Sequence, residues 1–296
     1  MPENVGRPTE HLPNSKIIRT SPEAQGFSQW SSPVGTLGEL IQAATIRAQA
    51  LAARTGELER LAAEPRAVPS FASALAGPSI AVIAEIKRAS PSRGDINKGI
   101  SAARQARAYE AGGAAAVSVL TEPHRFGGRD SDLTDAARAC ELPMLKKDFH
   151  VSEIQLIEAK AMGSSAALII VRALSPARLR AMAAVARDID LEILFEIRDE
   201  AELDRALEAG ALTIGVNNRD LETLEVDPTT VPRIVPLIPR DRIAIAESGY
   251  STIADVQTAA RAGADAVLVG SVLSASADPG ATVRAMSAVA RFTSVR

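Results

Sequence analysis

Eight short apolar runs, each followed by an alanine-rich stretch of helical character, constrain the fold of this chain more than any other feature. Most of the runs are continuously apolar rather than alternating, which is typical of strands that are covered on both faces. Such strands, repeated with a helix between each pair, predict successive parallel β-α units. The runs lie at residues 80–86, 116–120, 143–147, 167–171, 192–197, 212–216, 242–246 and 266–269.

Glycines recur just before every second run. Gly112, Gly163, Gly210 and Gly263 each end a helical stretch, where glycine suits the left-handed residue that stops a helix. Their spacing is roughly 50 residues, or two β-α units of about 25 residues each. An open dinucleotide-binding sheet is the alternative, but the sequence contains neither G-x-G-x-x-G nor the P-loop pattern. We therefore expect one closed (β/α)8 TIM barrel.

The residues before the first run have a different character. The N-terminal part holds scattered Pro, Gly, Ser and Asn without a period, and Phe27 or Trp30 is its candidate docking residue. From Thr36 onward, apolar residues recur at gaps of three and four, which predicts an amphipathic helix, and residues 71–75 predict a second, short helix. The expected organisation is a flexible tail at 1–35, a helical extension packed on the barrel at 36–76 and the barrel at 77–296.

Composition excludes several classes of function. The 33 Lys and Arg against 36 Asp and Glu give a formal charge of −3, which disfavours nucleic acid as a partner. Cys140 is the one cysteine, so neither an intramolecular disulfide nor a thiolate zinc cage can form, and the three histidines lack metal-ligand spacing. No apolar run reaches the ~18 residues of a membrane span. With no signal-peptide pattern at the N-terminus, we expect a cytoplasmic protein without a metal or cofactor.

Charged and amide residues follow the predicted strands, where a barrel builds its active site. Glu85 and Lys87 are two residues apart at the end of the first run and so point to the same side of a strand. A structural ion pair is the alternative explanation for these two. Lys147 ends the third run, Glu196 is the next-to-last residue of the fifth, and Asn217 follows the sixth. Each alone is explained as a surface charge or a turn residue. Together at one rim they predict a site for acid-base chemistry.

Small residues follow the last two strands. Ser248 and Gly249 come after the seventh run, and Gly270 and Ser271 after the eighth. Such residues let backbone N–H groups approach an anion closely, and the loops after strands seven and eight are the usual phosphate site of a barrel. Tight strand-helix packing is the alternative reason for small residues here. The sequence favours a phosphorylated substrate.

The octapeptide Glu85-Ile-Lys-Arg-Ala-Ser-Pro-Ser92 resembles the signature of the indole-3-glycerol phosphate synthase family. That family closes the indole ring in tryptophan biosynthesis on a barrel with an extra N-terminal helix. The resemblance covers roughly residues 36–290. It continues through Thr121-Glu122, Arg125-Phe126, Lys147-Asp148-Phe149, the segment 215–221, Glu247-Ser248-Gly249 and Gly270-Ser271.

The resemblance implies a reaction and a role for each residue. The substrate is 1-(2-carboxyphenylamino)-1-deoxyribulose 5-phosphate, the products are indole-3-glycerol phosphate, CO2 and water, and no cofactor is implied. Lys147 is the expected ring-closing acid, with Lys87 assisting it or protonating the departing hydroxyl. Glu196 and Glu85 are the candidate bases and orienting groups, and Asn217 holds a substrate hydroxyl or carboxylate. Phe126, Phe149 and Leu168 are expected to line the anthranilate pocket, with Ser90 closing one side, and Arg219 is expected to bind substrate by supporting the site. Ser248, Gly249, Gly270 and Ser271 are the expected phosphate-binding residues.

Several alternatives remain open at this stage. Phosphoribosylanthranilate isomerase is a related phosphate-binding barrel, but it leaves Glu85, Lys87 and the leading helix unexplained. A non-catalytic barrel that binds a phosphorylated ligand is a second alternative. The third is a paralogue acting on a substituted anthranilate, since the chain departs from the usual family pattern at Arg129, His150, Phe195 and Tyr250. In the absence of a coiled-coil seam we expect a monomer.

Overall fold

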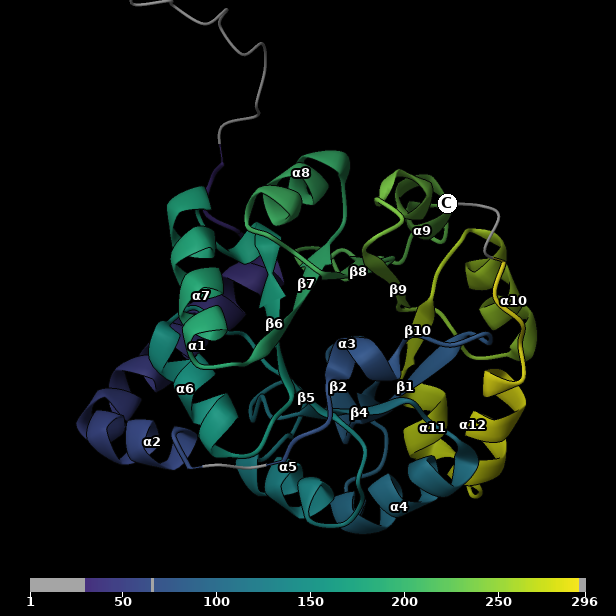
Figure 1. The fold of residues 1–296 in the computed structure, drawn as a ribbon, viewed down its shortest axis with the longest axis horizontal. Helices are drawn as coiled ribbons and strands as arrows, with labels where there is room; N and C mark the ends of the chain where they lie inside the picture. Colours follow the sequence, from purple (N-terminus) through teal and green to yellow (C-terminus); the bar gives the residue numbers. More distant parts are fainter. Residues whose placement is uncertain (1–29, 65–66, 293–296) are drawn as a thin grey trace, which may run out of the picture.

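A closed, eight-stranded parallel barrel forms the centre of the molecule (Figure 1). The computed structural model describes residues 30–64 and 67–292. The last strand pairs with the first, with Ala81 opposite Ala266, so the sheet closes and the TIM-barrel prediction is confirmed. The strands are, around the barrel, β1 (Ala81–Ile86), β4 (Ala116–Leu120), β5 (Met144–Lys147), β6 (Ala166–Ile170), β7 (Glu192–Ile197), β8 (Thr213–Asn217), β9 (Ile243–Glu247) and β10 (Ala266–Val269).

Helices surround the barrel and bury the outward faces of its strands. Their ends are set locally: Ser101 and Ser175 each accept a backbone N–H in the first turn of the helix that follows, and Pro176 occupies a first-turn position where its missing N–H costs nothing. No helix in the described part of the chain is long and apolar enough to cross a membrane. The helices that follow the strands are α4 (Ala102–Gly112), α5 (Asp130–Ala137), α6 (Glu153–Ala161), α7 (Pro176–Asp188), α8 (Glu200–Glu208), α9 (Thr230–Ile234), α10 (Ile253–Arg261), α11 (Ser271–Ala275) and α12 (Pro279–Ser287).

The glycine repeat stops the helices as expected, with one correction. Gly163, Gly210 and Gly263 have φ of 91°, 85° and 94°, the left-handed conformation that glycine adopts without strain. In the first repeat Gly113, with φ of 86°, takes this role, and not Gly112. Gly112 is still the last residue of α4, where its missing side chain leaves room for the backbone of α12.

The N-terminal extension packs against the barrel. It comprises α1 (Gly35–Leu51), a 3-10 turn (Ala52–Arg54), α2 (Thr55–Ala62) and α3 (Phe71–Ala74). The Trp30 indole N–H donates to the carbonyl oxygen of Arg172 at 3.2 Å, whereas Phe27 lies outside the described residues. The Glu192 carboxylate, at the start of β7, accepts the N–H groups of Phe71 and Ala72, which fixes α3 at the amino ends of the strands. The buried side of α1 consists of Leu37, Leu40, Ala44 and Ala48.

A small antiparallel hairpin follows β1 and was not expected from the sequence. Its strands are β2 (Ala89–Ser90) and β3 (Gly94–Asp95). The Ala89 N–H donates to the carbonyl oxygen of Phe126 at 3.1 Å, which joins the loop after β1 to the loop after β4. Both loops lie at the carboxyl ends of the strands, so the hairpin forms part of the rim of the site described below.

Candidate active site

A cavity of about 250 Å³ lies at the carboxyl ends of the strands. This is the end at which barrels place their active sites, because the β-α loops there can carry functional side chains without disturbing the core. All of the site residues predicted from the sequence line this cavity. They are Lys147, Lys87, Glu196, Glu85, Asn217, Ser90, Phe126, Phe149, Leu168, Arg219, Ser248, Gly249, Gly270 and Ser271.

Lys147 is the centre of a buried charge cluster. Its Nζ lies 2.8 Å from Oε2 of Glu196 and 3.3 Å from Oε2 of Glu247, although the three residues come from β5, β7 and β9. Burial disfavours the ammonium charge, but the carboxylates of Glu196 and Glu247 outweigh that cost and raise the pKa of Lys147. Lys147 is therefore a cation at neutral pH and a strong hydrogen-bond donor to an oxygen that gains negative charge.

The two carboxyl groups beside Lys147 have opposite pKa shifts. Burial alone would raise the pKa of Glu196, but Lys147 reverses the effect and lowers it. Burial raises the pKa of Glu247 to about 8, because the attraction of Lys147 is countered by repulsion from Glu196. The pair therefore carries one proton near neutral pH, and the site holds both a carboxylate and a carboxylic acid within reach of Lys147.

Glu247 was missed as a site residue by the reasoning from sequence, which assigned only the Ser248-Gly249 that follow it. The signal was present, because Glu247 is an acidic residue at the last position of an otherwise apolar strand. Its register partner across the sheet is Asn217, itself a predicted site residue. A side chain on Gly215 would overlap the Glu247 carboxylate, so a small residue in the neighbouring strand creates the space that this acid occupies.

Glu85 and Lys87 form a second ion pair on the rim. Lys87 Nζ lies 2.5 Å from Oε1 of Glu85, so the two residues point to the same side, as their spacing predicted. Glu85 is almost fully buried, while Lys87 keeps part of its surface in the cavity. A side chain on Gly270 would overlap the Glu85 carboxylate and crowd the end of Lys87, so Gly270 leaves room for this pair as well as for a ligand.

An aromatic wall closes one side of the cavity. The rings of Phe126 and Phe149 have centroids 6.3 Å apart and are tilted by 39°, a favourable arrangement for two aromatic rings. Leu168 and Ser90 are buried beside the same cavity. This surface offers an apolar slot of the kind that an aryl ring fills, beside the charged clusters.

Asn217 and Arg219 are held by the loop after β8. The Arg219 N–H donates to Oδ1 of Asn217 at 2.9 Å, and the Arg219 guanidinium donates to the carbonyl oxygen of Leu224 at 2.7 Å. Asn217 also hydrogen-bonds with Glu196, which lowers the pKa of that carboxyl. Both side chains are therefore fixed before any ligand binds.

The loop after β9 has two successive residues in the left-handed backbone conformation. Ser248 and Gly249 have φ of 63° and 91°, and a left-handed serine is held only where its surroundings impose it. The Asn218 amide imposes it here: its Nδ2 donates to the Ser248 carbonyl at 3.1 Å and to the Tyr250 hydroxyl at 3.3 Å. Its Oδ1 accepts the N–H of Val231 at 3.0 Å, which ties the loop to α9.

Comparison with known proteins agrees with this geometry. The family model for indole-3-glycerol phosphate synthase matches residues 39–286. The chain belongs to the indole-3-glycerol phosphate synthase family. Indole-3-glycerol phosphate synthase 2 of Streptomyces coelicolor is 47% identical over 78% of this chain and 89% of its own length. The enzyme of that name from Opitutus terrae is 46% identical over 77% of this chain and 88% of its own length.

Membership of the indole-3-glycerol phosphate synthase family makes this protein a carboxy-lyase of tryptophan biosynthesis. The solved structures that resemble it include 3-hexulose-6-phosphate synthase from Salmonella typhimurium, with a TM-score of 0.56, 15% identity and coverage of 70% of this chain and 97% of that one. Thiamine phosphate pyrophosphorylase from Pyrococcus furiosus has a TM-score of 0.54 at 13% identity, over 71% and 94% of the two chains. These two likenesses concern the barrel fold alone.

The four departures from the usual pattern of the synthase family lie in different places. Tyr250 lines the cavity and directly follows Ser248 and Gly249 in the chain. His150 is buried, and its Nδ1 lies 2.7 Å from the carbonyl oxygen of Leu168. Phe195 and Arg129 are not among the residues that line the cavity. Of the four, Tyr250 alone lies in the cavity lining, and the variation leaves Phe126 and Phe149 unchanged.

Proposed function

We propose that the Lys147 cluster performs the ring closure of the synthase reaction. The observation that carries this proposal is the position of the Lys147 ammonium between Glu196 and Glu247 in the cavity. The ring carbon that bears the carboxylate attacks the ketone carbon, and the ketone oxygen must take up a proton. A buried cation stabilises that oxygen as charge develops on it, and donates the proton in the same step.

Loss of CO2 then restores the aromatic ring, and the new alcohol must leave as water. That elimination needs an acid at the hydroxyl and a base at the neighbouring carbon. We assign the acid role to Lys87, which is held by Glu85 on the rim, and the base role to Glu196, whose lowered pKa keeps it ionised. The protonated Glu247 supports this role, because its side-chain hydrogen bond to Glu196 lowers the pKa of Glu196 further.

Substrate binding divides between the two sides of the cavity. The anthranilate ring lies against Phe126, Phe149 and Leu168, with Ser90 closing one side and Arg219 supporting the loop opposite. Asn217 holds a substrate hydroxyl or carboxylate. The phosphate is received by backbone N–H groups and hydroxyls of Ser248, Gly249, Gly270 and Ser271, where the left-handed backbone at Ser248 and Gly249 supports an anion.

All of these groups come from one chain, which is consistent with a monomer that needs no partner to complete its site. We propose that the protein acts as a monomer in the cytoplasm. Sedimentation equilibrium at several protein concentrations checks the first statement, and activity that rises with concentration faster than linearly would contradict it. Fractionation of cells that express the full chain checks the second.

Single-turnover kinetics with two readouts tests whether Lys147 acts in ring closure and Lys87 in dehydration. Indole fluorescence reports the final product, and CO2 release reports the step before it. For Lys147→Ala we expect neither signal, and for Lys87→Met we expect CO2 release that runs ahead of indole fluorescence. Equal delay of both signals in Lys87→Met would reject its assignment to dehydration.

A further inference from the structure

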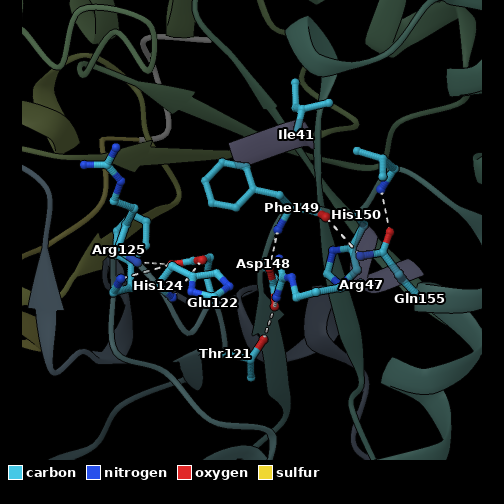
Figure 2. A network of polar contacts seen from close by, with 12 residues as sticks. Ile41, Arg47, Thr121, Glu122, His124, Arg125, Asp148, Phe149, His150 and Gln155 are labelled. Carbon is cyan, nitrogen blue, oxygen red and sulfur yellow. Dashed lines mark hydrogen bonds and ion pairs between the residues drawn. The ribbon is translucent and has the colours of Figure 1, made fainter. Parts of the chain in front are cut away.

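Two buried carboxylates lie next to the aromatic wall without belonging to either charged cluster (Figure 2). Glu122 follows β4 and Asp148 follows β5, and both are almost completely shielded from solvent. A buried carboxylate is costly unless it is paired, so each must have a specific partner set. Those partners show what the two residues do.

Asp148 uses both of its oxygens in contacts within the protein. Oδ1 accepts from Arg47 Nη2 and from the Phe149 N–H, both at 2.7 Å. Oδ2 accepts from the Thr121 hydroxyl at 2.6 Å and from Arg47 Nη1 at 3.1 Å. Burial opposes ionisation, but the Arg47 guanidinium outweighs it and lowers the pKa of Asp148 to about 2. Ionised Asp148 therefore binds Arg47 and the backbone N–H of Phe149.

Glu122 holds the backbone that carries the second ring of the wall, Phe126. Its carboxylate accepts three successive backbone N–H groups, from His124 at 2.9 Å, Arg125 at 2.6 Å and Phe126 at 3.0 Å. A carboxylate bound by three amides holds the loop in one conformation. Because Thr121 is adjacent in the chain and donates to Asp148, the two carboxylates belong to one connected network (Figure 2).

Arg47 connects this network to the N-terminal extension. It lies on α1, and its two parallel hydrogen bonds to Asp148 span 101 positions in the sequence. Such a bidentate pair fixes orientation as well as distance, which a single ammonium cannot do. Helix α1 thereby contributes to the site in two ways, because Leu40 lines the cavity and Arg47 pairs with Asp148 beneath the Phe149 backbone.

We propose that Arg47, acting through Asp148, is a positioning residue that sets the Phe126–Phe149 wall for the aryl ring of the substrate. Glu122 holds the second ring of that wall in the same network. This inference rests on the proposed placement of the anthranilate ring against the two phenylalanines. The helical extension is then part of substrate selection, and the phosphate side of the cavity is independent of it.

A comparison of kinetic constants tests this with the full chain. Arg47→Gln removes the ion pair, and we expect KM to rise about tenfold and kcat to change less than about threefold, because binding of the ring is lost rather than the acid. Inhibition by inorganic phosphate alone should keep its inhibition constant. Arg47→Lys should recover part of the loss. The control is Arg54→Gln, which breaks the exposed Arg54–Glu57 pair of the same extension and should leave both constants unchanged.

A double-mutant cycle separates positioning from general support of the fold. If Arg47 acts through Phe149, then Arg47→Gln combined with Phe149→Leu should raise KM little more than Phe149→Leu alone. Additive effects would overturn the inference, and so would equal weakening of phosphate inhibition by Arg47→Gln. An unchanged KM in a folded Arg47→Gln protein would also overturn the inference. If the anthranilate ring does not lie against Phe149, Phe149→Leu alone would leave KM unchanged. That result would contradict the proposed placement of the ring and is distinct from the outcomes for Arg47.

Discussion

Gly215 on β8 and Glu247 on β9 are a matched pair, because the carboxylate of Glu247 occupies the space that a side chain on Gly215 would need. The same relationship recurs between Gly270 and Glu85. Both acids reach into a barrel interior that bulky side chains would otherwise fill. The absence of a side chain at one strand thus determines where an ionisable group of the next strand can lie.

Gly215→Ala should displace Glu247 and separate it from Lys147. We expect kcat to fall by about 10²-fold or more, since a shift of about 1 Å in a catalytic group has effects of that size. Steady-state indole fluorescence measures the loss. Gly56→Ala is the control, because that glycine lies in α2 with open space around it, and it should keep full activity with a slightly higher Tm. Normal kcat in Gly215→Ala would show that Glu247 is not needed where it lies.

Lys147→Ala should abolish turnover and keep the fold. Loss of a positioned proton-transfer group typically costs ~10²–10⁴-fold in rate. Its neighbour Lys146 provides the contrast, because its Nζ pairs with Glu158 at 2.6 Å and has no place in the cavity lining. Lys146→Met should lower stability on the order of 2 kcal/mol by leaving the partly buried Glu158 unpaired, with kcat close to normal. Near-normal product formation by Lys147→Ala would reject its catalytic assignment.

Asn218→Ala should weaken binding of the phosphate. The amide of Asn218 holds the Ser248 carbonyl, the Tyr250 hydroxyl and the Val231 N–H, so its removal frees a strained backbone. We expect the inhibition constant for inorganic phosphate to rise about tenfold, a loss of roughly 1.4 kcal/mol. Tyr250→Phe removes one of these contacts and should have a smaller effect. An unchanged inhibition constant in Asn218→Ala would mean that the loop keeps its shape unaided.

Glu202→Gln should stabilise the protein at alkaline pH. Glu202 is buried near the start of α8, and burial followed by repulsion from Asp199 raises its pKa to about 7 from an ordinary 4.5. The folded state therefore keeps a proton that the unfolded chain releases, so the stability contribution of this group declines as pH rises from about 4.5 to 7. At pH 8 the variant should exceed the parent by on the order of 2 kcal/mol.

Urea unfolding at pH 5 and pH 8 measures this difference, which should shrink toward the lower pH. The matched control is Glu200→Gln on the same helix, because Glu200 is exposed and paired with Arg233, which lowers its pKa. That variant should show no gain at pH 8. A gain of equal size at both pH values would contradict the assignment to Glu202 ionisation.

Local sequence was sufficient for the parts of this protein that depend on short-range order. Continuous apolar runs indicated eight strands, and the residues at their ends indicated the charged, amide and small residues of the cavity, because strand geometry determines which side chains share a face. Ser90, Phe126 and Leu168 were expected there only from the resemblance to the synthase family. It was not sufficient at two adjacent glycines, Gly112 and Gly113, which have equal conformational freedom. Gly113 takes the left-handed conformation that stops α4, and Gly112, the last residue of the helix, packs against the backbone of α12.

The chain's sequence by itself therefore determined the barrel, its catalytic end and the residue types gathered there. Only the tertiary structure decided which of those groups touch. Lys147 and Glu247 stand on strands that are separated by three others, and barrel closure alone brings their charged atoms to 3.3 Å. Arg47 and Asp148 meet because α1 packs over the same end of the barrel. Contacts of this kind are set by closure and packing across the fold, and no spacing along the chain encodes them.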